Sequence, residues 1–312
     1  MPIPLRNTGP AIVIFNGVSF YFKTGLDYEV VETTVPIEVD AFGEIAKVFK
    51  DRMVKFSGTP AGMIRAGDIA AQMPFQTANV GASIFGNTDT PLVIQTINDG
   101  QTITWTRGGI GKYAPMLLSA TKGTIYSGAM DFYCLMASTF VLTGASAWNG
   151  ITSTAYADAT FDQSKLRMGQ YVAAWGSTSP FSGMIAEDGF TFTPELKVKP
   201  LAVDNFGIID YIVDSVTCSA KFKAANLTEA NVETMLAMQG TSAMLPGAAI
   251  GDGGNSLIIT GPHLAVTMPG SAPHASKMPF GKGKLRYSEL TFSSVTTFTT
   301  GVPNPVFSFA VS

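Results

Sequence analysis

The sequence predicts a mainly β protein in which two β domains follow one another, each with one short helix. The first observation is an internal repeat: three short motifs recur in the same order, 160 to 166 residues apart, at 39–43 and 203–207, at 81–84 and 247–250, and at 122–125 and 282–285. A repeat of this length is a domain rather than one turn of a solenoid. The second observation is a period-two alternation of apolar and polar residues near these motifs. We therefore expect a first domain at 1–146, a linker with a possible last strand at 147–164, and a second domain at 165–312.

The alternation predicts strands at 35–39, 102–106 and 216–222, where every second residue is apolar. In such a strand one set of side chains faces a core and the other faces water, so the apolar set of each stretch is expected to be buried. Pro36 and Pro200 fall at the same point of the repeat. Because proline donates no ladder hydrogen bond, they predict a sheet edge or a bulge there.

The motif at 39–43 and 203–207 predicts a turn that joins two strands into a hairpin in each domain. In such a turn aspartate caps backbone donors and glycine accepts a positive φ. The aromatic residue between them is expected to fold back on the sheet. The turn residues are Asp40, Phe42 and Gly43 in the first domain and Asp204, Phe206 and Gly207 in the second.

One helix is predicted at 229–238, where Thr228 can cap the N-terminus and Gly240 can end the run. Glutamates lie in its early turns, where the helix dipole favours them. The counterpart in the first domain is 63–73. It contains Gly67, so local propensity supports that helix only weakly.

Charged residues make up 14% of the chain, and the net charge is −3. This balance excludes tight wrapping of nucleic acid, which needs clustered lysine and arginine to neutralise phosphates. No apolar run reaches the roughly 18 residues of a membrane helix, and the N-terminus lacks the pattern of a secretion signal. We therefore expect assembly in a cytoplasm, without membrane insertion by this chain.

The two cysteines fall at non-equivalent positions of the repeat. Cys134 falls opposite Ser294, and Cys218 falls opposite Val54. A thiol whose counterpart is serine or valine is interpreted as a small core residue. Together with the expected compartment, this predicts no disulfide.

The sequence carries no catalytic, cofactor or metal motif. His263 and His274 are interpreted as loop residues beside prolines, because no cysteine or carboxylate cluster lies near them at metal spacing. The stretches 108–112 and 281–284 look like fragments of a phosphate loop but lack its first glycine and its final serine or threonine. We interpret both as hairpin tips. The protein is therefore predicted not to be an enzyme and to need no cofactor.

Taken together, these features resemble the tail tube proteins of long-tailed bacteriophages. The resemblance rests on 39–43 and 203–207, the alternating strands around them and the helix that follows Thr228, duplicated over nearly the whole chain. It implies β-sandwich or half-barrel domains that complete a large β-barrel ring on oligomerisation. Family members with one such domain form sixfold rings. Members with two in tandem form homotrimers with pseudo-sixfold symmetry.

The resemblance implies a structural virion protein, the major tail tube subunit, whose stacked rings form the channel for DNA ejection. Its partners would be other copies of itself, other tail proteins, and double-stranded DNA that passes through the lumen without specific binding. Its location would be the virion tail, assembled in the host cytoplasm. Because a channel for DNA should not hold phosphates, we expect Asp and Glu to outnumber Lys and Arg on its wall.

Three other readings share parts of this pattern. Another ring component of the tail or baseplate, such as a distal tail or hub protein, has the same kind of domain. A carbohydrate-binding β-sandwich could use Trp148 and Trp175, although Trp175 matches Phe15 in the repeat, which indicates a core position. An outer-membrane porin shares the strand pattern, but the sequence shows no aromatic girdles.

Overall fold

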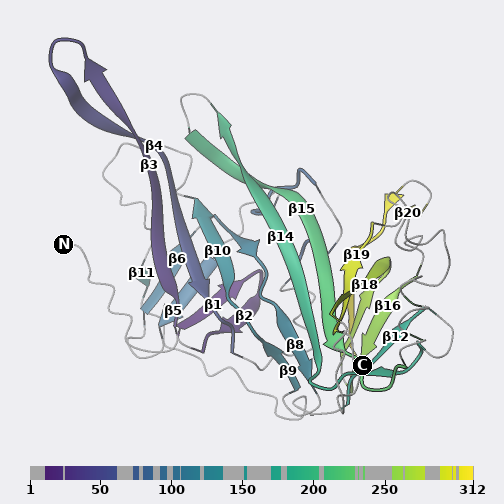
Figure 1. The fold of residues 1–312 in the computed structure, drawn as a ribbon. Coiled ribbons are helices and arrows are strands. Elements are labelled where there is room, and N and C mark those ends of the chain that lie inside the picture. Colours follow the sequence, from purple (N-terminus) through teal and green to yellow (C-terminus); the bar gives the residue numbers. More distant parts are fainter. Residues whose placement is uncertain are drawn as a thin grey trace.

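The computed structural model is mainly β and consists of antiparallel sheets (Figure 1). It describes residues 11–23, 25–61, 73–76, 80–86, 92–96, 101–105, 107–119, 123–135, 151–152, 170–176, 181–203, 207–228, 231, 235, 255–262, 264–277, 289–296, 298–299 and 302–311.

Two sheets come mostly from the first half of the chain, and we call them the N-terminal sheet pair. The five-stranded sheet has the order β11 (Ile151–Thr152), β6 (Gln101–Trp105), β5 (Leu92–Thr96), β1 (Ala11–Phe15), β2 (Val18–Tyr21). The four-stranded sheet has the order β3 (Asp27–Val39), β4 (Gly43–Gly58), β10 (Met130–Leu135), β7 (Gly108–Lys112).

Two further sheets form the C-terminal sheet pair. The five-stranded sheet has the order β13 (Met184–Ile185), β12 (Val172–Trp175), β16 (Leu257–Thr260), β17 (Leu264–Met268), β22 (Ser308–Val311). The six-stranded sheet has the order β18 (Ser271–Lys277), β19 (Glu289–Ser294), β15 (Gly207–Lys223), β14 (Phe190–Val203), β8 (Met116–Ser119), β9 (Gly123–Tyr126). A small sheet pairs β20 (Phe298–Thr299) with β21 (Val302–Pro303).

The two sheet pairs have the same strand order. The order β2-β1-β5-β6-β11 matches β13-β12-β16-β17-β22, and β3-β4-β10-β7 matches β14-β15-β19-β18. One difference breaks this correspondence, because β8 and β9 come from the first half of the chain but extend the six-stranded sheet of the C-terminal sheet pair beyond β14. The sheets therefore join the two halves of the sequence.

Each sheet pair packs around a central phenylalanine. Phe132 on β10 meets Phe15, Phe20 and Phe22 edge-on, with ring centroids 5.3 to 6.4 Å apart. At the matching place on β19, Phe292 packs against Phe222 and Trp175 at 5.7 and 6.1 Å. Edge-to-face and offset contacts of this kind stabilise cores beyond simple burial.

The expected equivalence of Trp175 and Phe15 agrees with the ladders. Phe15 on β1 lies opposite Leu92, and Trp175 on β12 lies opposite Leu257. Trp175 is partly buried against the core, and its Nε1 donates to the hydroxyl of Ser271 at 3.1 Å. Its ring is therefore a packing element rather than an exposed platform for a sugar. Trp148 lies outside the described residues.

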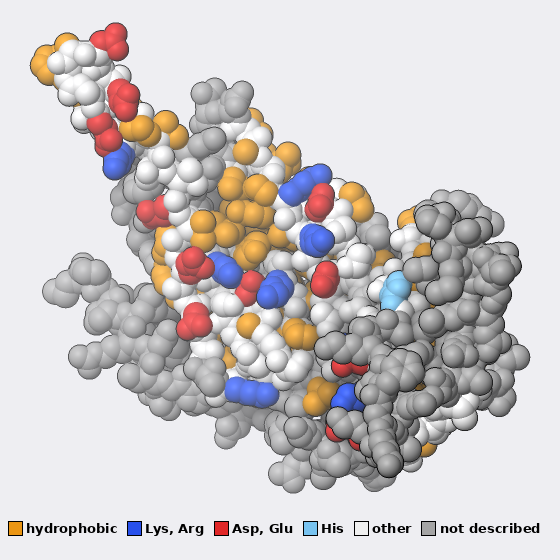
Figure 2. Space-filling view, viewed as in Figure 1, with side chains coloured by type: hydrophobic (Ala, Val, Ile, Leu, Met, Phe, Trp, Pro, Cys, Tyr) orange, Lys and Arg blue, Asp and Glu red, His pale blue; other side chains and the backbone are white. Residues whose placement is uncertain are grey.

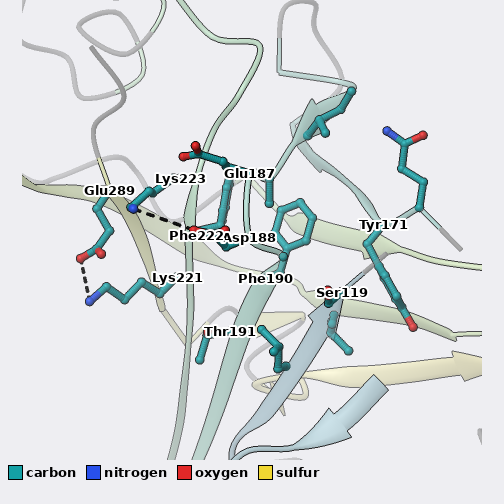
Figure 3. A pocket seen from close by; sticks show the side chains of 16 residues that line it. Ser119, Tyr171, Glu187, Asp188, Phe190, Thr191, Lys221, Phe222, Lys223 and Glu289 are labelled. Atoms are coloured by element: carbon teal, nitrogen blue, oxygen red, sulfur yellow. Dashed lines mark ion pairs between the residues drawn. The ribbon is translucent and has the colours of Figure 1, made fainter. Parts of the chain in front are cut away.

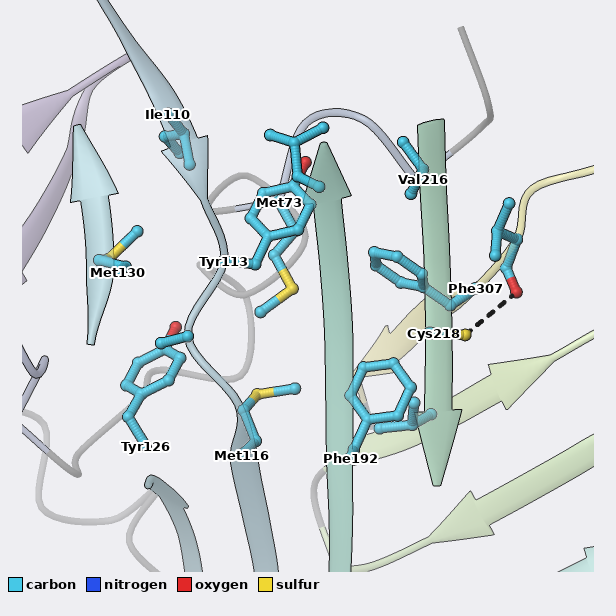
Figure 4. Close-up of a cluster of buried hydrophobic side chains, with 14 of the residues drawn as sticks. Met73, Ile110, Tyr113, Met116, Tyr126, Met130, Phe192, Val216, Cys218 and Phe307 are labelled. Carbon is cyan, nitrogen blue, oxygen red and sulfur yellow. Dashed lines mark hydrogen bonds between the residues drawn. The ribbon is translucent and has the colours of Figure 1, made fainter. Parts of the chain in front are cut away.

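A third buried cluster fills the seam between the two sheet pairs (Figure 4). Tyr113 and Met116 come from the first half, while Phe192 and Phe307 come from the second. The Tyr113 and Phe307 rings meet edge-on at 6.3 Å, and the Tyr113 hydroxyl accepts a hydrogen bond from the Phe75 amide at 2.9 Å. The two halves thus share one continuous hydrophobic core. We call these four side chains the seam cluster.

The predicted helix begins as expected where the structure describes it. Asn231 and Met235 are helical, and the Asn231 amide donates to the Thr228 hydroxyl at 3.3 Å, which is the expected cap. The rest of 229–238 lies outside the described residues. So does the predicted counterpart at 63–73, except for the buried Met73.

The alternation places the strands correctly but not all of their faces. In β15 the apolar set at 216–222 is buried as expected. In β3 the expectation is wrong, because Val35, Ile37 and Val39 are 46, 43 and 40% exposed. The reason is that β10 covers β4 only from Met53 to Gly58, so beyond that point the β3–β4 hairpin leaves the body (Figure 1).

Two stretches expected in turns or loops are strands. The stretch Gly108–Lys112 is β7, paired with β10, and not a hairpin tip. Its glycines serve close packing, since a Cβ on Gly109 would lie 2.6 Å from the Ile84 carbonyl oxygen and a Cβ on Gly111 would lie 2.6 Å from the Tyr133 ring. His274 lies in β18, opposite Thr291, rather than in a loop. His263 and 281–284 lie outside the described residues.

Candidate assembly interface

Two long hairpins dominate the molecule and share their geometry. We call β3–β4 the N-terminal hairpin and β14–β15 the C-terminal hairpin. The first has register shifts after Thr33 and Ile37, and the second after Lys197 and Leu201. Each pair is separated by the same 164 residues as the repeated turn. Bulges twist a hairpin and set its direction, so the two hairpins curve at the same places.

The structure describes the turn of the N-terminal hairpin and only the last residue of the C-terminal one. The turn in the N-terminal hairpin is closed by a hydrogen bond from the Phe42 amide to the Val39 carbonyl at 2.9 Å. Gly43 has a φ of +71°, which fits the expected role of glycine. Phe42 does not fold back on the sheet but is 81% exposed. In the C-terminal hairpin Gly207 pairs with Val203, while Asp204 and Phe206 lie outside the described residues.

Both prolines of the repeat lie where predicted. Pro36 is in β3, which has β4 as its sole neighbour among the described strands. Pro200 is in the part of β14 beyond β8, and both prolines lie one residue before a register shift. A missing amide donor is tolerated at such an edge.

The C-terminal hairpin is clasped on its first edge by β8 from the other half of the chain. Phe190, Thr191 and Phe192 pair with Leu118, Leu117 and Met116. Phe190 is 1% and Phe192 is 0% exposed. Gly189, with a φ of +93°, lets the strands approach, since a Cβ there would lie 2.6 Å from the Leu118 carbonyl oxygen.

The second edge of the C-terminal hairpin is held by the segment 81–84. The Gly81 and Ile84 amides donate to the carbonyls of Val213 and Tyr211, at 2.8 and 2.9 Å, and the Val213 amide donates back to Ala82 at 2.8 Å. Val213, whose side chain lies in the core, is 0% exposed. This segment is one of the motifs whose recurrence marked the internal repeat.

A polar group fixes this second edge, and we call Ser83, Arg107 and Asp210 the Asp210 cluster. The Ser83 hydroxyl donates to one carboxylate oxygen of Asp210 at 2.8 Å, and an Arg107 nitrogen lies 3.9 Å from the other. Arg107 also donates to the Ile209 carbonyl at 2.7 Å and lies over the Phe85 ring at 5.1 Å. The cluster is partly buried, so its charges are less screened than an exposed ion pair.

Sequence reasoning did not find the Asp210 cluster, although the repeat contained a signal. The counterpart of Asp210 in the ladders is Ala46, since Leu201 pairs with Asp210 and Ile37 pairs with Ala46. The sequence counterpart of Ser83 is Ala249. A polar residue whose counterpart is alanine marks a contact that one half makes and the other does not.

The N-terminal hairpin lacks a comparable clasp among the described residues. Its β3 edge and the part of β4 before Met53 pair only with each other. Its exposed apolar side chains include Val35, Ile37, Val39, Phe42 and Ile45. A long unpaired edge with apolar side chains is a site for pairing with another strand.

The C-terminal hairpin has one apolar and one polar face. On β14 the alternate residues Phe192, Leu196 and Val198 face the core side, opposite Ala220, Val216 and Val213. The other face carries the charged residues Glu195, Lys197, Lys199, Asp210 and Lys221. Figure 2 shows charged side chains of both signs interspersed on this side of the molecule. Several are paired, such as Lys199 with Asp214 at 3.3 Å and Lys221 with Glu289 at 2.6 Å.

A hollow of about 960 Å³ lies beside the junction of β8 and β14 (Figure 3). Tyr171 and Phe190 are among its lining residues. Its two lysines form ion pairs, Lys221 with Glu289 and Lys223 with Asp188 at 3.9 Å. Within the described residues, no group of three His, Cys, Asp or Glu side chains could hold a metal ion. The hollow is lined by residues of both β8 and β14.

Both cysteines are buried free thiols. Burial raises the pKa of Cys134 far above its usual range, and it raises the pKa of Cys218 to about 12 against a smaller opposing effect of the Ser294 hydroxyl. Cys134 pairs with Val54 and the Cys218 amide bonds to Ser294 at 2.9 Å. Each cysteine therefore faces the residue that replaces the other in the repeat.

Comparison of the sequence with protein-family models and with curated proteins found no match. In the part of the chain that the structure describes, no helix has the length and apolar character needed to cross a membrane.

Proposed function

We propose that this chain is a structural subunit that associates with copies of itself into rings, and that the rings stack as the tail tube of a long-tailed bacteriophage. The observation that carries the proposal is the pair of hairpins with bulges at matching positions, set in sheets of the same strand order. Two such units in one chain favour a trimer with pseudo-sixfold symmetry. The chain acts as a scaffold and not as an enzyme.

The free edges of the N-terminal hairpin support association. An isolated edge with exposed apolar residues is a liability that proteins remove by covering or closing it. A head-to-tail arrangement closes into a ring when the rotation between neighbours divides a full turn. In a closed barrel of many strands the polar faces of the hairpins would surround an aqueous channel.

The charges on the polar face of the C-terminal hairpin change one expectation. The described charges of this hairpin are Lys197, Lys199, Lys221 and Lys223 against Glu195, Asp210 and Asp214, with three of the lysines in ion pairs. An acidic excess is therefore not supported on this hairpin. We propose instead a wall close to neutral, on which lysines held by carboxylates have little free charge to retain a phosphate.

The test is electron microscopy of the purified protein together with its mass in solution. Rings with the mass of three chains, or tubes built from them, are the expected result. A monomer at high concentration that binds sugar would overturn the proposal in favour of a carbohydrate-binding β-sandwich. Rings that never stack, and that bind the end of a tube made by another protein, would indicate a distal tail or hub component instead.

A further inference from the structure

The two halves of the chain form one contact with each other, which we call the joint within the chain. The chain also carries both surfaces that a second joint of the same kind would need. In the joint within the chain, β8 and the segment 81–84 of the first half clasp the two edges of the C-terminal hairpin. The N-terminal hairpin has the corresponding edges, and they are uncovered among the described residues. The second half has the same sheet order as the first, so its described strands can present an equivalent surface to another copy.

The first uncovered edge can be located by counting along the repeat. The residues of β14 that β8 covers correspond to 26–28, that is to Leu26 and the first two residues of β3. Gly25 has a φ of +89°, close to that of its counterpart Gly189, but no described residue lies within 4 Å of a Cβ placed there. At Gly189 the same space holds the Leu118 carbonyl. Leu26 and Tyr28 are half-buried, whereas their counterparts Phe190 and Phe192 are fully covered.

The second uncovered edge lies on β4. Tyr211 and Val213, which pair with 81–84, correspond to positions 47 and 49, and the neighbouring Asp210 corresponds to Ala46. Ala46 and Lys47 are exposed, whereas Tyr211 is 8% and Val213 is 0% exposed.

All three members of the Asp210 cluster have counterparts without a polar side chain. Asp210 corresponds to Ala46, and Ser83 corresponds in sequence to Ala249. Arg107 corresponds to Gly270, because the Leu135 amide donates to the Arg107 carbonyl at 3.2 Å and the Val295 amide donates to the Gly270 carbonyl at 2.9 Å. Because all three polar side chains are replaced together, no charge or hydrogen-bond donor is left without a partner. Replacing only one of them would leave such a group buried and unpaired, which is costly.

We propose that a second copy of this chain covers the N-terminal hairpin with its C-terminal half, at 26–28 where β3 begins and at 46–49 on β4, through a joint that lacks the Asp210 cluster. The two kinds of joint then differ in chemistry. The joint within a chain is held by an ion pair and a hydroxyl, while the joint between chains relies on backbone pairing and apolar contact. This inference rests on the proposed ring only for its head-to-tail direction.

The test uses Ala46→Asp with Ala41→Asp as its matched control. Ala46→Asp puts a carboxylate into the joint, where it would face Gly270 in place of an arginine. Because an unpaired charge is costly to desolvate, we expect association to weaken by at least about 100-fold. Ala41 is an exposed turn residue outside the joint, so Ala41→Asp should leave the ring mass unchanged. Sedimentation velocity measures the association, and circular dichroism checks the fold.

A second arm restores the missing partner. Gly270→Arg supplies a guanidinium at the place that corresponds to Arg107, so it should also prevent self-association when it faces Ala46. A mixture of Ala46→Asp and Gly270→Arg chains should associate again in a one-to-one ratio, because both joints between the two variants are then compatible. The altered hairpin meets the altered half, and the unaltered hairpin meets the unaltered half. If Gly270→Arg fails to fold, the comparison of Ala46→Asp with Ala41→Asp decides alone.

Electron microscopy separates this inference from the proposed function. Rings formed alike by the unaltered chain and by Ala46→Asp would overturn the joint and leave the ring intact. A complex of the unaltered chain that has no ring shape, but that Ala46→Asp dissociates, would support the joint and overturn the tube. An unaltered chain that stays monomeric would overturn both.

Discussion

Truncation of Phe192 tests whether the two halves of the chain fold as one unit. Phe192 is 0% exposed and lies opposite Met116 of β8. Its ring meets those of Phe307 and Phe309 at 5.6 and 5.9 Å. A Phe→Ala change in a core costs about 3–5 kcal/mol. Two aromatic contacts place Phe192→Ala in the upper part of that range, a large share of a total stability of about 5–15 kcal/mol.

The assay is urea unfolding followed by circular dichroism, with Phe42→Ala as the control. Phe42 is 81% exposed, so its truncation should change the free energy of unfolding by less than about 0.5 kcal/mol. Hydrogen exchange then locates the effect: β8 and β14 should lose protection together. A cost below about 1 kcal/mol for Phe192→Ala, or loss of protection in β14 with β8 unchanged, would refute a shared core.

Two other predictions concern a glycine and the thiols. Gly189→Ala should destabilise the protein more than Gly17→Ala. Gly189 and Gly17 have left-handed φ values of +93° and +76°, which cost an alanine about 1–2 kcal/mol, but only Gly189 also faces the Leu118 carbonyl. Equal urea midpoints for the two variants would contradict this. Cys134 and Cys218 should not react with a thiol reagent at pH 8 until urea is added. Because unfolded thiols ionise near about pH 8.5 and the folded Cys218 pKa is raised to about 12, their contribution to stability is complete below about pH 8.5 and lost progressively up to about pH 12. Unfolding curves that do not change between pH 8 and pH 10.5 would exclude this.

Much of the strand arrangement could be predicted because it depends on local pattern. The repeated turn defined both hairpins, and the repeat predicted the matching places of Phe15 and Trp175. The alternation could not tell where a strand leaves the body, so the exposure of Val35 and Ile37 was missed. A two-residue period is the same in a covered strand and in a projecting one.

The site was harder to predict than the strands, because it depends on contacts between distant parts of the chain. Neither the pairing of β8 with β14 nor the meeting of Arg107 with Asp210, 103 residues later, follows from local propensity. The glycines of β7 gave a misleading loop signal because their role is to let Ile84 and Tyr133 approach. Only a comparison of the two halves, residue by residue, could have marked the Asp210 cluster.

The joint between β8 and β14 has a consequence for the kinetics of assembly. Two units on one chain meet at an effective concentration in the millimolar range, far above that of separate molecules. In the proposed ring of three such chains, half of the six joints would form during folding, before any encounter between molecules. Ring closure would then need fewer bimolecular steps than a ring of six separate units. The covalent link would set the order of events, folding first and closure second.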